Sequence, residues 1–143
     1  MGTTTGVGYS IHRNPAEAGK EAALKALEQA GIAKPDFVFV FATVGYNQEV
    51  LIRSIREATA GAPLSGCSGE GIITRETVAE TNFAVTVMVI SSDELRFNNA
   101  RVKEIDRKAD IAGERLGEEI RPFHPASRFC ATGQSERPRW GHA

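Results

Sequence analysis

The apolar positions of the first half of the chain alternate between strand spacing and helix spacing. Residues 3–10 form a β-rich opening, and residues 14–17 then supply an N-cap asparagine, a proline at the first helical position and a glutamate placed to close a capping box. The apolar positions that follow recur at close to helical spacing: Ala16, Ala23, Leu27 and Ala30. Because Gly31 suits a C-terminal cap, this pattern predicts a first helix that ends near Ala30.

A second strand and a second helix continue this rhythm. Residues 37–41 are apolar on both strand faces, which predicts an interior strand of a sheet covered on each side. The polar turn at residues 43–47 leads into an amphipathic helix that should end at Gly61. Its inward positions are expected to be Leu51, Ile55 and Ala58. The chain therefore opens with a βαβα order, typical of an α/β fold.

The second half of the chain carries more strand patterns. Residues 70–78 fit a strand or a hairpin arm, and residues 82–90 alternate as a strand whose two faces both look covered. After a turn at residues 91–94, the apolar positions Leu95, Phe97 and Ala100 alternate with polar ones. This alternation predicts a half-exposed strand paired antiparallel with its predecessor. The fold class expected is α/β, with a mixed sheet that holds a later antiparallel strand pair and has helices packed on it.

A third helix is the last globular pattern. Asp106 suits its N-cap and Ile105 a hydrophobic staple. Its inner face is expected to carry Ala109, Ala112, Leu116 and Ile120. From Arg121 onward, prolines and arginines stand among small polar residues without an apolar period, so residues 1–120 are expected to form the domain and residues 121–143 a disordered tail. The rare residues of that tail are interpreted as incidental: His124, Cys130, Trp140 and His142.

Composition narrows the function classes. The chain has 143 residues, 41% of them hydrophobic and 24% charged, as expected for one soluble globular domain. Its 17 basic and 18 acidic residues are interspersed, which disfavours nucleic acid or an anionic membrane as a partner. The apolar run at residues 37–42 is too short to span a bilayer, and the N-terminus lacks the order of a signal peptide. Cys67 and Cys130 define neither a disulfide framework nor a zinc cluster, so a cytoplasmic location without a metal is expected.

The segment Leu64-Ser65-Gly66-Cys67-Ser68-Gly69-Glu70-Gly71-Ile72-Ile73 is the strongest candidate for chemistry. Its glycines allow close backbone approach, and its thiol, hydroxyls and carboxylate can contact a ligand, which is typical of a binding loop. A P-loop would need Lys-Ser/Thr after its last glycine, where this chain has Ile72 and Ile73. The glycines also lack the Gly-x-Gly-x-x-Gly order of a dinucleotide turn, so no nucleotide cofactor is expected.

Three consecutive parts of the chain resemble the N-terminal domain of the FIST family of sensory proteins. They are the strand at residues 36–41 with its turn and helix, the segment Pro63-Leu64-Ser65-Gly66-Cys67-Ser68-Gly69-Glu70-Gly71-Ile72, and the strand and hairpin after it. The resemblance covers roughly residues 3–120 and rests on the Gly-Cys-Ser mark of that family. Family members usually continue with Thr-Ala-Gly-Glu, where this chain has Gly69-Glu70-Gly71. The family's domain normally runs further, so the resemblance implies an incomplete member, with residues after 120 arising from a truncated or frame-shifted gene.

The resemblance implies a module of signal transduction that binds a small ligand, an amino acid among the candidates, and signals to a protein partner not identified by the sequence. The turn and the glycine-rich segment both follow strands, so they are expected to meet at one sheet edge and form a ligand crevice. The ligand-binding candidates are Tyr46, Asn47, Ser65, Gly66, Cys67, Ser68, Gly69 and Glu70. Backbone N–H groups with Ser65 or Ser68 would hold a carboxylate, and Glu70 would receive an ammonium group.

Two alternatives stay open at this stage. A thiol in a glycine-rich loop can act as a nucleophile, which would make the chain a Cys67-dependent enzyme with His12 as its base. The second alternative is that the chain is a fragment without activity of its own. The interpretation favoured by the resemblance is a sensor and not an enzyme.

Overall fold

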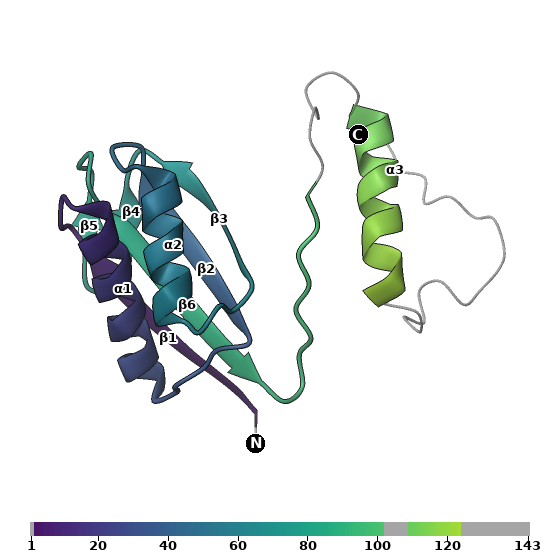
Figure 1. Cartoon of the computed structure of the whole chain (residues 1–143), viewed down its shortest axis with the longest axis horizontal. Helices are drawn as coiled ribbons and strands as arrows, with labels where there is room; N and C mark the ends of the chain where they lie inside the picture. The colour runs from purple at the N-terminus through teal and green to yellow at the C-terminus, as the bar shows by residue number, and fades with distance from the viewer. Residues whose placement is uncertain (1, 102–108, 124–143) are drawn as a thin grey trace, which may run out of the picture. The chain divides into compact units, whose positions relative to one another are not determined.

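The fold is built on a mixed four-stranded sheet in the order β1-β6-β2-β3 (Figure 1). The computed structural model describes residues 2–101 and 109–123, in two units that comprise residues 1–99 and 100–143. The sheet belongs to the first unit and consists of β1 (Thr3–Ser10), β6 (Val85–Ser92), β2 (Phe37–Thr43) and β3 (Leu64–Gly69). β6 runs antiparallel to both β1 and β2, whereas β3 runs parallel to β2. The predicted α/β class with a mixed sheet is confirmed.

Two helices, α1 (Pro15–Ala30) and α2 (Gln48–Ala58), cover the same face of this sheet (Figure 1). The sheet residues beneath them are small or β-branched: Val38, Val40, Ala42, Val85, Val87 and Val89. Leu51 and Ile55 of α2 are 1% and 0% exposed, as the helix pattern predicted. Burial of each such side chain stabilises the fold by roughly 1.5–3 kcal/mol.

The predicted boundaries of α1 are confirmed, but its capping box is not. The Asn14 side chain accepts hydrogen bonds from the N–H groups of Ala16 (2.9 Å) and Glu17 (3.3 Å), and Gly31 ends the helix at φ 65°. The N–H of Asn14 donates to His12 Nδ1 at 3.1 Å, where a capping box would use the Glu17 side chain. The imidazole therefore takes the place that the sequence pattern gave to a carboxylate.

Glycines bring α1 unusually close to β1. A Cβ added to Gly6 or Gly8 would collide with backbone atoms of α1, in particular with the carbonyl oxygens of Ala26 and Ala22. Because α1 presents alanines to this strand, the two backbones pack with almost no side chain between them.

The second face of the sheet is less covered than the sequence predicted. β2 presents Phe37, Phe39 and Phe41 to this face, and Phe97 stacks on Phe37 with ring centroids 5.3 Å apart. Phe37 is 4% exposed as a result, but Phe41 at the other end is 44% exposed. The prediction that β2 is covered on each side is therefore wrong at Phe41, because both helices of this unit pack on the opposite face.

The predicted antiparallel partner for residues 82–90 is also wrong. The strand forms as β6, but residues 95–100 form no strand. β6 already pairs with β1 on one side and with β2 on the other, and a strand has only two edges. Residues 70–78 instead contribute to a two-stranded sheet of β4 (Ile72–Ile73) and β5 (Val78–Ala79), consistent with the expected hairpin.

The second unit contains α3 (Ala109–Ile120) and the short 3-10 helix η1 (Arg121–Phe123). Of the predicted inner face of α3, Ala112 is buried and Leu116 and Ile120 are partly buried, whereas Ala109 is exposed. Regular structure thus extends past Ile120, the expected end of the domain. The predicted cap and staple, Asp106 and Ile105, lie outside the described residues, as do His124, Cys130, Trp140 and His142.

Candidate functional site

A small pocket lies where α2 meets the parallel strands β2 and β3. It has a volume of about 170 Å³. Its wall is mostly apolar, with polar groups at Gln48, Cys67 and Ser68. The apolar lining comes from Val40, Ala42, Leu51, Ile52 and Leu64, and Gly66 completes it. An apolar wall with few polar groups is the usual composition of a site for a small organic ligand.

The segment predicted to be a glycine-rich loop is in fact the edge strand β3 up to Gly69. Its residues pair in parallel with β2, with Gly66 opposite Val40 and Cys67 opposite Phe41. A side chain at position 66 would collide with the carbonyl oxygen of Val40. Gly66 is therefore needed for close strand approach, whereas the sequence pattern indicated a ligand-binding loop. The chemistry of the segment remains exposed, because residues 65–70 are all accessible to solvent.

The pocket runs along β3 from its first residue, Leu64, to Ser68 near the carboxyl end of the strand, beside Val40 and Ala42 of β2. α2 begins at the same end, and Asn47 is its N-cap, accepting a hydrogen bond from the N–H of Val50 at 3.2 Å. The N–H groups of the first helical turn point out of the helix N-terminus, where the helix dipole favours a negative charge. The pocket thus combines an apolar wall with a helix end suited to a carboxylate.

The structure brings together part of the predicted ligand set. Gly66, Cys67 and Ser68 line the pocket, and Asn47 immediately precedes its lining residue Gln48. Ser65, Gly69 and Glu70 belong to the same exposed segment without lining the pocket.

Tyr46 has a different environment from the one expected for a ligand contact. It is 5% exposed, and its hydroxyl donates to the carbonyl oxygen of His12 at 2.8 Å. Its ring packs edge-on against Phe83 with centroids 5.5 Å apart. Burial raises the pKa of the Tyr46 hydroxyl, and the negative charge of Glu21 adds to this effect. These contacts hold Tyr46 as a core residue that joins the chain before α1 to the turn before α2.

The postulated Cys67–His12 pair is not assembled. Cys67 is an exposed free thiol on β3, whereas His12 follows β1 at the other edge of the sheet. Three strand spacings separate these edges, roughly 14 Å at about 4.8 Å each. A thiol and its general base need hydrogen-bond contact, so His12 does not activate Cys67.

Sequence patterns did not identify the pocket residues that lie outside the glycine-rich segment. The polar one among them, Gln48, is the first residue of α2, and the signal for it was the N-cap at Asn47. The sequence pattern indicated only that Val40 and Leu64 are strand residues. Their role depends on the parallel pairing of β2 with β3, which no local pattern reports.

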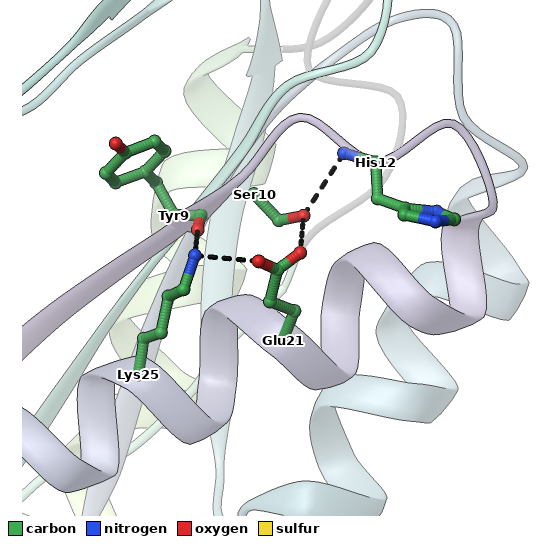
Figure 2. A network of polar contacts seen from close by, with 5 residues as sticks. All are labelled: Tyr9, Ser10, His12, Glu21 and Lys25. Carbon is green, nitrogen blue, oxygen red and sulfur yellow. Dashed lines mark hydrogen bonds and ion pairs between the residues drawn. The ribbon is translucent and has the colours of Figure 1, made fainter.

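A polar network at the other edge of the sheet was also missed (Figure 2). The Ser10 hydroxyl donates to the Glu21 carboxylate at 2.5 Å, and Lys25 pairs with the same carboxylate at 2.7 Å. Lys25 also donates to the carbonyl of Tyr9 at 3.3 Å. The Lys25 and Ser10 hydrogen bonds hold the pKa of Glu21 below its usual value. These contacts join α1 to β1 and satisfy one another, so we assign the network a structural role.

Within residues 2–101 and 109–123, no group of three or more metal-ligating side chains forms a site for a metal ion. In the same residues, no helix is long and apolar enough to cross a membrane.

Comparisons with solved structures give only weak similarity. An FtsZ dimer from M. jannaschii matches at 12% identity and a TM-score of 0.37, with 70% of this chain and 34% of that chain covered. An FtsZ-like protein of unknown function from Nostoc punctiforme matches at 15% identity and a TM-score of 0.29, with 64% and 93% covered. This chain thus spans about a third of the first of these proteins. Both TM-scores are too low to indicate function, and no curated protein matches the chain.

The family comparison is specific. The model of the FIST N domain matches residues 36–138, which is more than half of the chain and includes the whole pocket. The match begins at the residue before β2 and extends beyond Ile120. The Gly66-Cys67-Ser68 mark lies within it, on the strand that lines the pocket. The chain therefore belongs to the FIST family of signal-transduction sensory domains.

Proposed function

We propose that this FIST domain senses a small molecule that carries a carboxylate and a short apolar group, with a free amino acid as the best candidate. The observation that supports the proposal is the pocket between α2 and the strands β2 and β3, which is lined by three residues of the expected ligand set. Its volume of about 170 Å³ is below the range of roughly 300–1,000 Å³ typical of drug-sized ligands, so a small metabolite suits it better.

The polar groups at one end of the pocket define how such a ligand would lie. The carboxylate is placed at the N-terminus of α2, beside Gln48 and Ser68, where N–H groups and the helix dipole stabilise a negative charge. The apolar group of the ligand is placed against Leu51, Leu64 and Val40. The ammonium group is assigned to Glu70, which follows β3 directly and is exposed.

Signalling then follows from a population shift. A ligand held between α2 and β3 stabilises the arrangement in which these two elements lie together, and it favours any partner that binds that arrangement. The partner is a protein of the signalling pathway. We also propose a cytoplasmic location, because the exposed free thiol of Cys67 suits a reducing compartment.

Thermal unfolding of the full chain with single amino acids tests this proposal. A ligand at about 100 times its Kd adds roughly 2.7 kcal/mol, which corresponds to a rise of several degrees in Tm. We expect one or a few related amino acids to raise the Tm. A panel without any shift would argue against the amino acid, and a shift given equally by all of them would argue against a specific pocket.

A matched pair of variants locates the site. Gln48→Ala removes the side chain at the polar end of the pocket and should reduce the ligand-induced shift. Lys20→Ala changes an exposed position of α1 that does not line this pocket, and it should leave the shift unchanged. An equal effect of both variants would place the ligand elsewhere.

A further inference from the structure

The two edges of the four-stranded sheet differ in how far other side chains cover their backbone hydrogen-bonding groups. At the β1 edge, α1 covers the backbone groups: the N–H of Val7 donates to Gln29 Oε1 at 2.6 Å, and Lys25 Nζ donates to the carbonyl of Tyr9 at 3.3 Å. Such side chains prevent another strand from pairing with an edge. β1 is therefore a closed edge.

The β3 edge lacks this protection in the described part of the chain. The N–H of Val38 donates to the carbonyl of Pro63 at 2.9 Å, which sets the alternation of the parallel ladder. Residues 63, 65 and 67 turn their backbone groups toward β2, so Leu64, Gly66 and Ser68 turn theirs outward. Asn99 Nδ2 donates to the outward carbonyl of Leu64 at 2.8 Å. Gly66 and Ser68 have no hydrogen-bond partner among the described residues on that side.

The composition of β3 also favours pairing. None of its six residues is charged or a proline, although charge and proline are the usual means of blocking an edge. Its side chains are small, and residues 65–69 are exposed. An uncharged, exposed edge strand is a template for a further strand.

We propose that β3 pairs with β3 of a second copy of this chain, in antiparallel orientation around a two-fold axis at Cys67. In this register Gly66 exchanges two backbone hydrogen bonds with the partner's Ser68, and Ser68 does so with the partner's Gly66. The carbonyl of Leu64 remains with Asn99. Each outward group of Gly66 and Ser68 is then satisfied.

The position of α2 supports a second copy as the occupant. The pocket lining shows that α2 lies over β2 and β3. Pairing of the two β3 strands at about 4.8 Å therefore brings the two α2 helices to a separation of roughly 10 Å. Preferred helix-to-helix distances are about 8–10 Å, so the two helices pack side by side in opposite directions.

The outer side of α2 is complementary to itself in this arrangement. A groove of about 590 Å³ runs along it, and its lining includes the apolar Ile52 and two side chains of each charge: Glu49, Glu57, Arg53 and Arg56. With Ile52 at the two-fold axis, it faces the partner's Ile52, and Glu49, which pairs with Arg53 of its own helix at 3.1 Å, also faces the partner's Arg56. An apolar centre flanked by two opposite-charge pairs is a self-complementary surface.

Ile52, Gly66 and Ser68 belong both to the proposed dimer contact and to the pocket lining, so the test of the dimer uses the full chain without added amino acids. Sedimentation equilibrium over a wide range of protein concentration should show a reversible dimer. Ser68→Pro removes an outward N–H, which an edge strand tolerates, and it should give a folded monomer. A monomer at every concentration, or a dimer unchanged by Ser68→Pro, would overturn the proposal.

Charge reversal provides a second set of variants if Ser68→Pro does not fold. Arg56→Glu places like charges in contact twice around the two-fold axis and should weaken the dimer roughly tenfold. Glu49→Arg combined with Arg56→Glu restores opposite charges and should recover the affinity. Lys20→Glu, the same reversal on an exposed position of α1, should have no effect. If Lys20→Glu weakened the dimer as much as Arg56→Glu, the proposed contact between the two α2 helices would be wrong.

Disulfide formation tests the register. Two residues opposite each other in a non-hydrogen-bonded antiparallel pair have Cα atoms about 4.5 Å apart, within the range of a disulfide. With Cys130→Ser as the background, diamide should oxidise two Cys67 thiols to an intermolecular disulfide and be reduced to the hydrazine itself. Moving the thiol with Cys67→Ser and Ser65→Cys separates the two sulfurs by roughly 13 Å along the strands and should abolish the cross-link. Equal cross-linking at both positions would overturn this register.

Failure of this proposal is distinct from failure of the proposed function. A dimer without any ligand-induced shift would contradict the sensor proposal alone, and a ligand-induced shift in a strict monomer would contradict the dimer alone.

Discussion

The Ser10 hydroxyl donates a hydrogen bond of 2.5 Å to the Glu21 carboxylate and so joins the end of β1 to the middle of α1 (Figure 2). Ser10 is 2% exposed, whereas Glu21 is only half covered by its neighbours. The same hydroxyl accepts from the N–H of His12 at 3.2 Å, which fixes the chain as it leaves the strand. A single buried hydroxyl thus connects the closed edge of the sheet to the helix that covers it.

This contact makes part of the stability dependent on acid pH. The Lys25 and Ser10 hydrogen bonds depress the pKa of Glu21 below its usual 4.5, so the ionised form stabilises the fold above that pH. Stability should fall as pH drops from about 4.5 through the lower folded-state pKa. Because the Lys25–Glu21 pair is about half exposed, screening keeps the effect below about 1 kcal/mol.

Chemical denaturation of Glu21→Gln and wild type across this pH range measures the effect. The variant should have the flatter pH profile. Asp36 also has a depressed pKa, mainly through the Ser92 N–H and the Ser91 hydroxyl, so Asp36→Asn is the comparison for the remaining slope. Parallel profiles of wild type and Glu21→Gln would contradict this assignment.

Gly8→Ala should destabilise the fold by about 1–3 kcal/mol or more. The new Cβ would collide with the carbonyl of Ala22 and would lie 2.6 Å from the N of Ala26, and backbone atoms of a helix cannot move aside individually. Gly2→Ala is the control, since a Cβ there meets nothing within 4 Å. Equal Tm values for the two variants would show that α1 does not pack against β1 as closely as described.

Thr43→Val and Thr86→Val should change the free energy of unfolding by different amounts, although the chemical change is the same. Thr43 is 1% exposed, and its hydroxyl both accepts from the N–H of Ala84 at 2.9 Å and donates to its carbonyl at 3.3 Å. Its replacement leaves the buried N–H of Ala84 without a partner, at a cost of about 1–3 kcal/mol, whereas the Ala84 carbonyl still accepts from the N–H of Thr43 at 2.9 Å.

The buried hydroxyl of Thr86 has no partner in the described part of the protein. Thr86→Val therefore replaces an unsatisfied polar atom by a methyl group and should be neutral or stabilising. The unfolding free energies of the two variants, measured under the same conditions, check the pair. A loss at Thr86 as large as that at Thr43 would refute the comparison.

Tyr46→Phe should cost about 1 kcal/mol of stability, because it leaves the carbonyl of His12 without its 2.8 Å hydrogen bond. Since the Tyr46 hydroxyl is engaged in this contact, the variant should keep the full ligand-induced Tm shift. Thermal unfolding with and without the active amino acid measures both effects. Loss of the ligand-induced Tm shift with unchanged stability would indicate that Tyr46 contacts the ligand.

Cys67 should be alkylated readily by iodoacetamide, and an amino acid bound in the pocket should leave the rate unchanged. The thiol is exposed and shares the face of Phe41, its partner in the parallel ladder, whereas the pocket lies under α2 on the opposite face of the sheet. Cys130→Ser removes the other thiol of the chain, and mass spectrometry follows the modified fraction. An amino acid that raises the Tm and also slows the alkylation would bind on the Phe41 face of β3 and not in the pocket.

Local sequence patterns were sufficient for the elements that end in strong caps. Asn14 and Gly31 fix the bounds of α1, and the apolar spacing of Leu51 and Ile55 identifies the buried side of α2. The FIST resemblance at Gly66-Cys67-Ser68 was likewise available, because it depends on consecutive residues, and the family match confirms it.

The pairing partners of strands were not available from local patterns. The antiparallel partner predicted for β6 was its successor in the chain, yet β6 pairs with β1 and β2. Gly66 indicated a loop, because a glycine needed for flexibility and one needed for contact with Val40 look the same in a sequence.

By itself the sequence determined the α/β class, the bounds of α1, the FIST family and the segment that carries its mark, since all of these depend on short-range spacing and residue type. The end of α2 at Ala58, three residues before the predicted Gly61, did not follow from the sequence. Only the tertiary structure decided the strand order, and the strand order sets the distances between residues on different strands. It separates Cys67 from His12, places Gln48 beside Ser68, and leaves β3 at an open edge. Hydrogen bonds between strands join residues far apart in the chain, so their pattern follows from the packing of the whole sheet and not from any one segment.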